Sequence, residues 1–390
     1  MSVASSEEAA EFQATLRETA RAFLADRCPP AVARAIGDGD DDGSALWGAI
    51  ADLGWAGVEL GEDEGGLGAG FPELAILLEE CGRAVAPVPL LSTAVLGVGA
   101  LLAPAGGTAP AADAPPGSAA DGAPSAPLTT SARAALLARA SAGEAIVTAA
   151  LTGAAGTPGR IDVVAAPDGT LDGVAAFVPD LERAQAVVVA AVNTRTGQPG
   201  AYLVTLPAPG ATVEPQPTID RTRRLARLTL AGVRPEAHLG DAELVDLLAD
   251  RAALAIAADC VGGAERVLEI TLEHLKSREQ FGRALGTFQA LKHRCSDMFL
   301  LLTGARSAVA HAAQAVDRPA ERAVAVSIAK SYAAEAYAHI ASDGVQLHGA
   351  IGFTWEHDIH LFLKRAKLNE ALFGDADHHR DRLDSLILPR

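Results

Sequence analysis

Apolar residues recur at helical spacing on both sides of a short glycine-containing segment in the last third of the chain. Leu268, Leu272 and Leu275 precede this segment, and the same spacing resumes after it from Leu291 onward. Such spacing puts the apolar side chains on one helix face, because an α-helix completes a turn about every 3.6 residues. The pattern therefore predicts two long helices joined by a turn at residues 282–286.

Between residues 144 and 233 the pattern changes to short runs of β-branched and apolar residues separated by Gly, Pro and Asp. Runs of this length and composition are typical of strands, and the residues between them favour turns. The pattern predicts a small antiparallel β-domain. The expected strands are residues 145–150, 161–164, 173–178, 186–192, 201–206 and 225–230.

The amino-terminal part is again helical in pattern, with Phe12, Leu16 and Phe23 on one face. Residues 103–127 differ, because they contain six prolines and otherwise mostly Ala, Gly and Ser. Such a segment buries too little apolar surface to offset its ordering entropy, and we expect a flexible linker or surface loop. The predicted fold class is α+β multidomain. Its expected parts are an amino-terminal helical domain with the Pro/Ala-rich linker (1–127), a middle antiparallel β-domain (128–239) and a carboxy-terminal four-helix bundle (240–390).

Composition and charge narrow the range of functions. The 390 residues are 49% hydrophobic and 21% charged, as in soluble globular proteins, and the net charge of −17 argues against binding to nucleic acid or anionic membranes. No uncharged apolar run has spanning length, and the amino terminus lacks the basic residues of a signal peptide. Cys28, Cys81, Cys260 and Cys295 are widely spaced, which predicts reduced, buried thiols and a cytoplasmic protein.

Arg278 lies where the two predicted helices meet. An arginine at such a point is a good clamp for a phosphate, because its planar guanidinium presents donors that match the oxygens of the anion. The alternative is a structural salt bridge, which is the commoner role of a single arginine. The surrounding residues favour the clamp, and they read Ser277-Arg278-Glu279-Gln280-Phe281-Gly282-Arg283, with Phe288-Gln289 after a gap of four residues.

This string resembles the carboxy-terminal signature of the acyl-CoA dehydrogenase family. Residues 346–356 look like the second signature of that family, and Lys364-Arg365-Ala366 followed by Gly374 lies where its last motif is found. The loop 55–68 and the element Glu80-Cys81-Gly82-Arg83 resemble parts of its amino-terminal domain. Residues 352–358 are similar in sequence to the corresponding segment of actinobacterial sterol-degrading members of the family, which are heteromeric.

The resemblance implies an oxidoreductase that uses FAD to desaturate an acyl-CoA substrate in lipid metabolism. In the family, a carboxylate takes the α-proton of the thioester while a hydride leaves the β-carbon for the flavin. An electron-transfer flavoprotein then reoxidises the cofactor. The α-proton of a thioester is weakly acidic, so the base must be desolvated and held within reach. A flavin site shared between subunits further implies a homo- or hetero-oligomer, as a dimer or tetramer.

The resemblance also assigns residues to the cofactor. Arg278 and Phe281 match positions that contact the FAD diphosphate of a neighbouring subunit, and Phe288 and Gln289 match positions near the adenosine. Phe177 falls where the family has an aromatic residue beside the flavin ring. The loop that accepts the other end of the cofactor across the interface is Gln346, Leu347, His348, Gly349 and Ala350.

Two stretches depart from the family pattern. Ala350 replaces the usual second glycine of its loop, and residues 151–158 stand where the family has a Thr-Glu-Pro-x-x-Gly-Ser flavin loop. Phe177-Val178-Pro179 stands where the family commonly has Trp-Ile-Thr. Stacking on the flavin ring is therefore compatible with this sequence, whereas the hydroxyl contact to the flavin is not.

The usual catalytic base is missing. Many family members have a glutamate at the position of Phe373, others at the position of Ala252, and neither residue here can accept a proton. Asp259 shares a helical face with Ala252, because offsets of four and three residues stay near whole turns. We expect a buried Asp259 to have a raised pKa, which suits a base; the alternative is a polar helix contact. Glu370 is a second candidate, expected to face solvent or form a salt bridge.

Three functions follow from these observations. The chain is an acyl-CoA dehydrogenase with an unusual base, or a non-catalytic partner subunit that completes a flavin site in a heteromer, or a flavin oxidase or monooxygenase on the same fold. We predict no metal site: His378 and His379, beside Asp375 and Asp377, are interpreted as a charged helix end, since adjacent histidines diverge on a helix.

Overall fold

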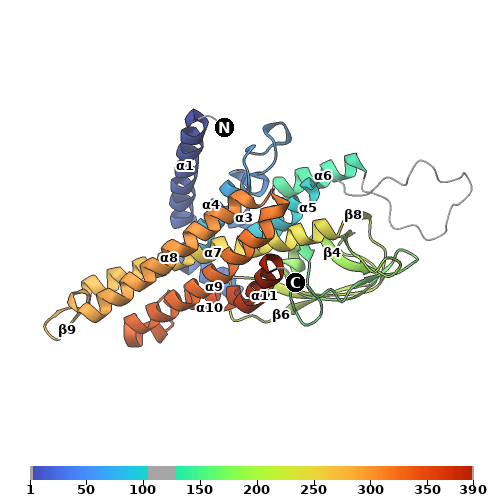
Figure 1. The fold of residues 1–390 in the computed structure, drawn as a ribbon. Helices are drawn as coiled ribbons and strands as arrows, with labels where there is room; N and C mark the ends of the chain where they lie inside the picture. Colours follow the sequence, from blue (N-terminus) through green and yellow to red (C-terminus); the bar gives the residue numbers. More distant parts are fainter. Residues whose placement is uncertain (1–2, 104–128, 389–390) are drawn as a thin grey trace, which may run out of the picture.

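The carboxy-terminal part of the chain is a bundle of long helices. The computed structural model describes residues 3–103 and 129–388. In Figure 1 the bundle runs along the molecule, and the connection between α7 and α8 lies at its far end from the sheet. The two long helices predicted on either side of this connection are confirmed. The bundle consists of α7 (Ala242–Ser277), α8 (Gln289–Ala315), α9 (Pro319–His348), α10 (Ile359–Ala371) and α11 (Ala376–Ile387).

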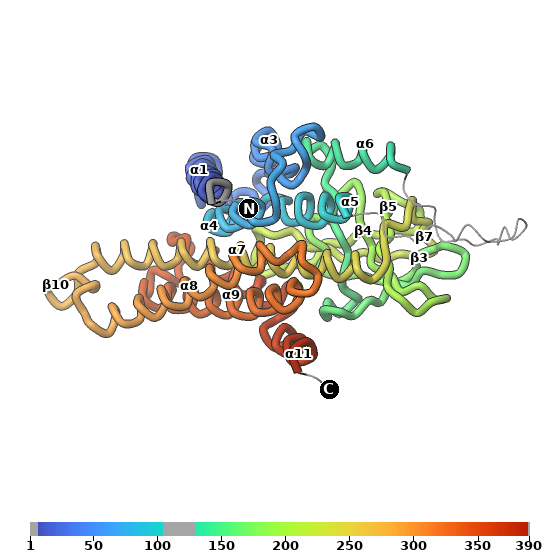
Figure 2. Tube along the Cα trace, turned by 45° about the horizontal axis from the view of Figure 1, so that its top comes forward, coloured from blue at the N-terminus to red at the C-terminus, as the bar shows by residue number. Residues whose placement is uncertain are grey.

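The amino-terminal helices cover one side of the bundle (Figure 2). α4 crosses α7 so closely that a Cβ at Gly262 would lie 1.7 Å from the carbonyl oxygen of Glu79. Only glycine fits there, so this crossing fixes how the first part of the chain sits on the bundle. The helices of this part are α1 (Val3–Arg27), α2 (Pro30–Asp38), α3 (Ser44–Asp52), α4 (Phe71–Arg83), the π-helical segment η3 (Leu91–Val98), α5 (Gly99–Leu102) and α6 (Thr130–Ser141).

The middle part is one sheet with the strand order β6-β7-β3-β2-β4-β5-β8, in which β1 also pairs with β4. Five of the six predicted strands are present, and the one predicted at residues 161–164 overlaps the observed strand only at Val164. The strands are β1 (Val147–Ala150), β2 (Val164–Ala165), β3 (Leu171–Pro179), β4 (Ala186–Asn193), β5 (Pro199–Thr205), β6 (Ala211–Gln216), β7 (Leu225–Val233) and β8 (Ala237–Asp241).

The expectation of a purely antiparallel sheet is wrong in one place. β1 and β2 share one edge of β4, and both run parallel to it. The sheet is therefore mixed, because pairing partners are chosen by tertiary packing and leave no mark on the local alternation of side chains. β6 and β8 were also not predicted. β6 is a polar edge strand that contains Pro215, and β8 has five residues, so neither shows the apolar runs that indicate strands.

Apolar residues form a helical core and two cores on the faces of the sheet. The side chain of Phe373 packs against the helical core and against the sheet core that contains Ala252. The Pro/Ala-rich linker lies almost wholly outside the described residues, and the domain boundaries stay predictions. Within 3–103 and 129–388, no helix is both long and apolar enough to cross a membrane.

Candidate functional site

A short hairpin connects α7 and α8. β9 (Glu279–Gln280) pairs with β10 (Arg283–Ala284), and the turn between them places Phe281 at a φ of 55°. The ring of Phe281 is 90% exposed and lies 6.1 Å, centroid to centroid, from the ring of Phe288. The guanidinium of Arg283 stacks over the same Phe288 ring at 3.9 Å. The hairpin therefore presents aromatic and cationic groups to the outside.

Arg278 and the loop at residues 346–350 line one surface pocket of about 400 Å³. Arg278 ends α7, where its backbone N–H donates to His274 O at 2.8 Å. Its guanidinium is exposed and forms no ion pair within the part of the chain that the structure describes. A free guanidinium in an open pocket suits an anionic ligand such as a phosphate. A Cβ at Gly349, whose φ is 64°, would meet nothing within 4 Å, so this loop is open to a ligand.

The structure thus brings together six of the ten residues predicted to contact the cofactor: Arg278, Gln346, Leu347, His348, Gly349 and Ala350. Phe281 and Phe288 lie on the adjoining hairpin, and Gln289 begins α8 and is exposed. Phe177 belongs to β3, which lies on the side of the molecule opposite to the hairpin (Figure 2). One chain therefore does not gather all ten residues at a single site.

Two histidines, His274 and His348, line this pocket, and the ring of His357 packs against that of His348. The sequence-based reasoning found only His348 as a site residue. The ring of His348 lies 4.4 Å from that of His274 and 4.5 Å from that of His357, measured between centroids. The Nδ1 of His348 is 2.7 Å from Gly344 O. His274 lines the pocket as well, and its place one turn before Arg278 on the same helix was the signal that could have found it.

Burial in this stack lowers the pKa of His348 to about 4. A folded-state pKa below the ordinary value of about 6.5 means that the unfolded chain takes up a proton first, so stability falls as the pH falls from 6.5 toward 4. We expect the loss in unfolding free energy between pH 7 and pH 4.5 to be roughly 1 to 2 kcal/mol smaller in His348→Phe than in the parent, because solvent in the open pocket screens part of the effect. Urea unfolding at the two pH values measures this.

The matched control is His311→Gln, because His311 is exposed on α8. We expect this variant to keep the acid dependence of the parent protein. Part of that dependence should persist in His348→Phe, because burial also lowers the pKa of His379, to about 3. Equal acid dependence in His348→Phe and the parent protein would contradict the assignment.

Phe177 is 37% exposed on β3, and its ring packs against the loop at residues 151–158. Its φ is 55°, its backbone N–H donates to Gln216 Oε1 at 2.6 Å, and a Cβ at Gly156 would lie 2.4 Å from its ring. The loop at residues 151–158 is held by bonds to its neighbours: Thr152 Oγ1 donates to Ala176 O, and the N–H of Ala154 donates to Asp162. These groups of the loop are already engaged within the chain.

Neither usual base position holds a carboxylate. Ala252 is fully buried among apolar residues, and the neighbouring Arg251 pairs with Glu59. Phe373 has a φ of 57° in the turn that follows α10. That turn is fixed by Lys330, whose buried ammonium donates to Gly374 O at 2.6 Å. The position of the usual catalytic glutamate therefore lies in an ordered turn and is occupied by the side chain of Phe373.

Asp259 belongs to a buried ion cluster. Its Oδ2 lies 2.9 Å from Arg365 Nη1 and 2.8 Å from Arg223 Nη2, and its Oδ1 accepts a hydrogen bond from Asn369 Nδ2 at 2.7 Å. Arg365 also pairs with Asp220. The cluster thus joins α7, α10 and the residues before β7, and it uses both oxygens of Asp259.

The expectation of a raised pKa at Asp259 is wrong. Burial alone raises the pKa of this carboxyl, but the charges of Arg223 and Arg365 outweigh burial and lower it below the usual value. A carboxylate with a lowered pKa and several donors is a poor proton acceptor. Glu370 forms an ion pair with Lys367 at 2.8 Å, in line with the expected salt bridge.

The remaining candidates have structural roles. Asp375 caps α11 by accepting a hydrogen bond from the N–H of His378 at 2.8 Å. No group of three or more His, Cys, Asp or Glu residues suited to a metal ion is found within residues 3–103 and 129–388. The four cysteines are free and buried, as predicted.

Comparisons with known proteins identify the family. Residues 10–109 match the family described as "Acyl-CoA dehydrogenase, N-terminal domain", and residues 247–387 match "Acyl-CoA dehydrogenase, C-terminal domain". The chain is also similar to acyl-CoA dehydrogenase IpdE2 of Mycobacterium tuberculosis, with 34% identity over 97% of this chain and 98% of that one. This chain therefore belongs to the acyl-CoA dehydrogenase family.

Two similar solved structures have paired names, and one of them is described as a complex. A variant of the Tcur3481-Tcur3483 steroid ACAD is 32% identical with a TM-score of 0.81, and the ChsE4-ChsE5 complex from Mycobacterium tuberculosis is 27% identical with a TM-score of 0.83. Each match covers 97% of this chain and 98% of the other. A glutaryl-CoA dehydrogenase from Mycobacterium smegmatis, in complex with FADH2, shares the fold at 19% identity and a TM-score of 0.81 over 96% of this chain and 94% of that one. FAD is the cofactor of the family.

Proposed function

We propose that this chain is a subunit of an FAD-dependent acyl-CoA dehydrogenase, in which it completes the flavin site of a partner chain that supplies the base. The proposal rests on the difference between the Arg278 pocket and the candidate positions for the base. The Arg278 pocket is open, and its guanidinium forms no ion pair with the residues that the structure describes, whereas Ala252, Phe373 and Asp259 provide no carboxylate free to take a proton.

In this proposal the pocket and the adjoining hairpin would hold the diphosphate and adenosine half of FAD. Arg278 would bind a phosphate oxygen through charge-assisted hydrogen bonds, and the open backbone at Gly349 would let the cofactor approach closely. When bound, FAD supplies the acceptor for the hydride. The role of this chain is to hold and orient that cofactor.

The other half of a flavin site is poorly developed in this chain. The N–H groups of Phe177 and Ala154, in the stretches where the family meets the flavin ring, are already bonded to Gln216 and Asp162. Binding the ring there would require these bonds to break. This supports a flavin whose ring end lies in the partner and whose diphosphate end lies against Arg278.

The reaction assigned to the assembly is α,β-desaturation of a CoA thioester, with an electron-transfer flavoprotein as electron acceptor. A hetero-oligomer is supported by the similarity to the ChsE4-ChsE5 complex and to the Tcur3481-Tcur3483 structure, both of which have paired names. The four buried, reduced thiols suit a reducing compartment, and we place the protein in the cytoplasm. The Arg278 pocket would serve a homomeric dehydrogenase or a flavin oxidase or monooxygenase equally well, so flavin content and turnover must separate the three functions.

The test is to purify the chain alone and after co-expression with a base-bearing acyl-CoA dehydrogenase from the same host. We expect the chain alone to be colourless, and the complex to be yellow and to bleach when acyl-CoA is added without oxygen. Visible absorbance and mass spectrometry measure flavin and chain composition.

Other outcomes identify the other functions. A yellow single chain that is bleached by acyl-CoA would establish a homomeric enzyme and refute the partner role. Oxygen consumption by the flavin without NADH would indicate an oxidase, and a requirement for a separate reductant would indicate a monooxygenase.

A further inference from the structure

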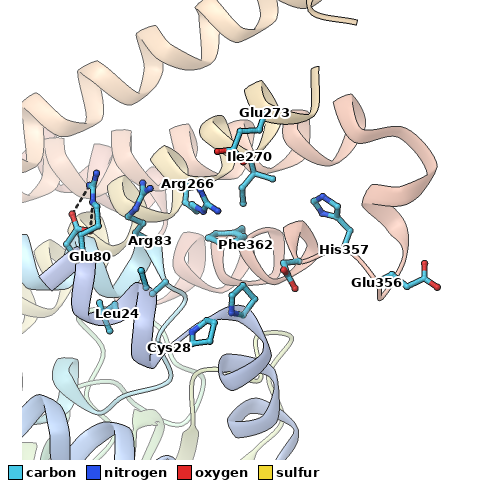
Figure 3. Close-up of a pocket in the computed structure, with 16 residues that line it drawn as sticks. Leu24, Cys28, Glu80, Arg83, Arg266, Ile270, Glu273, Glu356, His357 and Phe362 are labelled. Carbon is cyan, nitrogen blue, oxygen red and sulfur yellow. Dashed lines mark hydrogen bonds and ion pairs between the residues drawn. The ribbon is translucent and has the colours of Figure 1, made fainter. Parts of the chain in front are cut away.

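A second cleft, of about 450 Å³, lies between the amino-terminal helices and the bundle. Its walls come from α1, α4, α7 and α10 and from the loop at residues 356–358. Figure 3 shows Arg83 and Arg266 toward one end, Phe362 in the middle, and His357 and Glu356 at the other end. The volume lies in the range of small-molecule sites, which is about 300 to 1,000 Å³.

The arginine end of the cleft belongs to a network of ion pairs with unequal charges. Five arginines meet four glutamates: Arg17, Arg21, Arg83, Arg266 and Arg306 with Glu79, Glu80, Glu265 and Glu269. If all nine groups are charged, one positive charge is left uncompensated. An anion placed against the network would balance it.

Arg266 and Arg306 each have one carboxylate partner in this network, and of the two Arg266 lines the cleft. Its Nη1 contacts Glu269 Oε2 at 3.2 Å, and Glu269 also takes two bonds from Arg83. The described residues give Arg266 no other hydrogen bond. Because Arg266 lines the cleft, its remaining donors are the natural partners for an anionic ligand.

The middle of the cleft is apolar. Leu24 and Cys28 lie on one wall, Ile270 on another, and Phe362 between them (Figure 3). Ile270 follows Arg266 by one helical turn, so an apolar side chain and a cationic side chain are neighbours on the same face of α7. A ligand that uses both must carry an anion at one end of an apolar body.

The opposite end of the cleft is acidic. Glu356 lies at this end and Glu273 lies beside Ile270 (Figure 3), and neither forms an ion pair within the described parts of the chain. Asp358 is also there but is paired with Arg34. A second negative group on the ligand would meet these carboxylates and be repelled. The cleft therefore discriminates against dicarboxylates and against the polyanionic CoA moiety.

We infer that this cleft binds a monocarboxylate with a short apolar body, with the carboxylate on Arg266 and the apolar body between Ile270 and Phe362. The site is separate from the Arg278 pocket, with which it shares no lining residue. The inference does not depend on the proposed flavin role.

The test is calorimetric titration of the full chain, in whichever assembly it purifies, with hexanoate, hexanamide and adipate. We expect saturable binding of hexanoate, at least tenfold weaker binding of adipate, and no binding of the uncharged hexanamide. Arg266→Gln keeps most of the side-chain volume and removes the charge, and we expect it to weaken hexanoate binding at least tenfold.

Two control variants make the result specific. Arg318→Gln removes an exposed arginine that pairs with Glu321, and Arg278→Gln removes the cation of the flavin pocket; both should bind hexanoate as the parent does. Equal binding of hexanoate and hexanamide, undiminished binding by Arg266→Gln, or no saturable binding would overturn the inference. Loss of binding in Arg278→Gln alone would place the carboxylate in the flavin pocket and overturn it as well.

Discussion

Replacing Arg278 with glutamine should weaken the binding of FAD to the assembled complex at least tenfold and so lower its FAD content, while leaving the fold intact. The guanidinium is exposed and has no ion pair in the described residues, so its loss leaves no buried charge behind. A hydrogen bond to a charged group contributes about 1.5 to 3 kcal/mol, which corresponds to roughly a 10- to 100-fold change in affinity. Flavin absorbance per mole of purified complex measures the effect.

Two further variants test whether the effect is specific to Arg278. Arg278→Lys keeps the charge but loses the planar fork, so its flavin content should fall between those of the parent and of Arg278→Gln. Arg318→Gln lowers the charge of the chain by the same amount at a distant exposed site, and its complex should retain FAD. Full flavin content in Arg278→Gln would remove this residue from the cofactor site.

The helices could be predicted from the sequence, because the apolar residues of a helix's buried face recur every three or four residues. α7 and α8 both have apolar residues at three- and four-residue spacing, and their ends are marked by the glycines of the hairpin. The parallel pairing of β1 with β4 could not be predicted from the sequence. It joins residues about 40 positions apart, and nothing within either strand specifies the direction of its partner.

The candidate site was predictable to a similar degree. Arg278 and the loop at residues 346–350 carry recognisable motifs, and the structure brings them into one pocket. The position of Asp259 on a buried helix face was also predicted, and it is 3% exposed. The partners of Asp259 were not predicted, because Arg365 lies 106 residues away on α10 and Arg223 precedes β7. The charge of a buried group is set by such distant neighbours.

Replacing Asp259 with asparagine is expected to destabilise the protein by about 3 to 5 kcal/mol, a far larger effect than most single substitutions. The side chain keeps its shape, but Arg223 loses its one carboxylate partner in the described residues and Arg365 keeps only Asp220. Two guanidinium groups then share a single negative charge in a buried site. Urea unfolding at pH 7 measures the loss.

The matched control is Asp38→Asn, which breaks an ion pair of similar length between Asp38 and Arg221, 2.8 Å apart. Both side chains of that pair are more than half exposed, so solvent screens the charges and the expected loss is below about 1 kcal/mol. The comparison also decides the role of Asp259 in catalysis. If Asp259→Asn unfolded like the parent and only turnover in the assembled enzyme fell, Asp259 would act as the base. A large loss of stability instead assigns it to the joint between α7, α10 and the sheet.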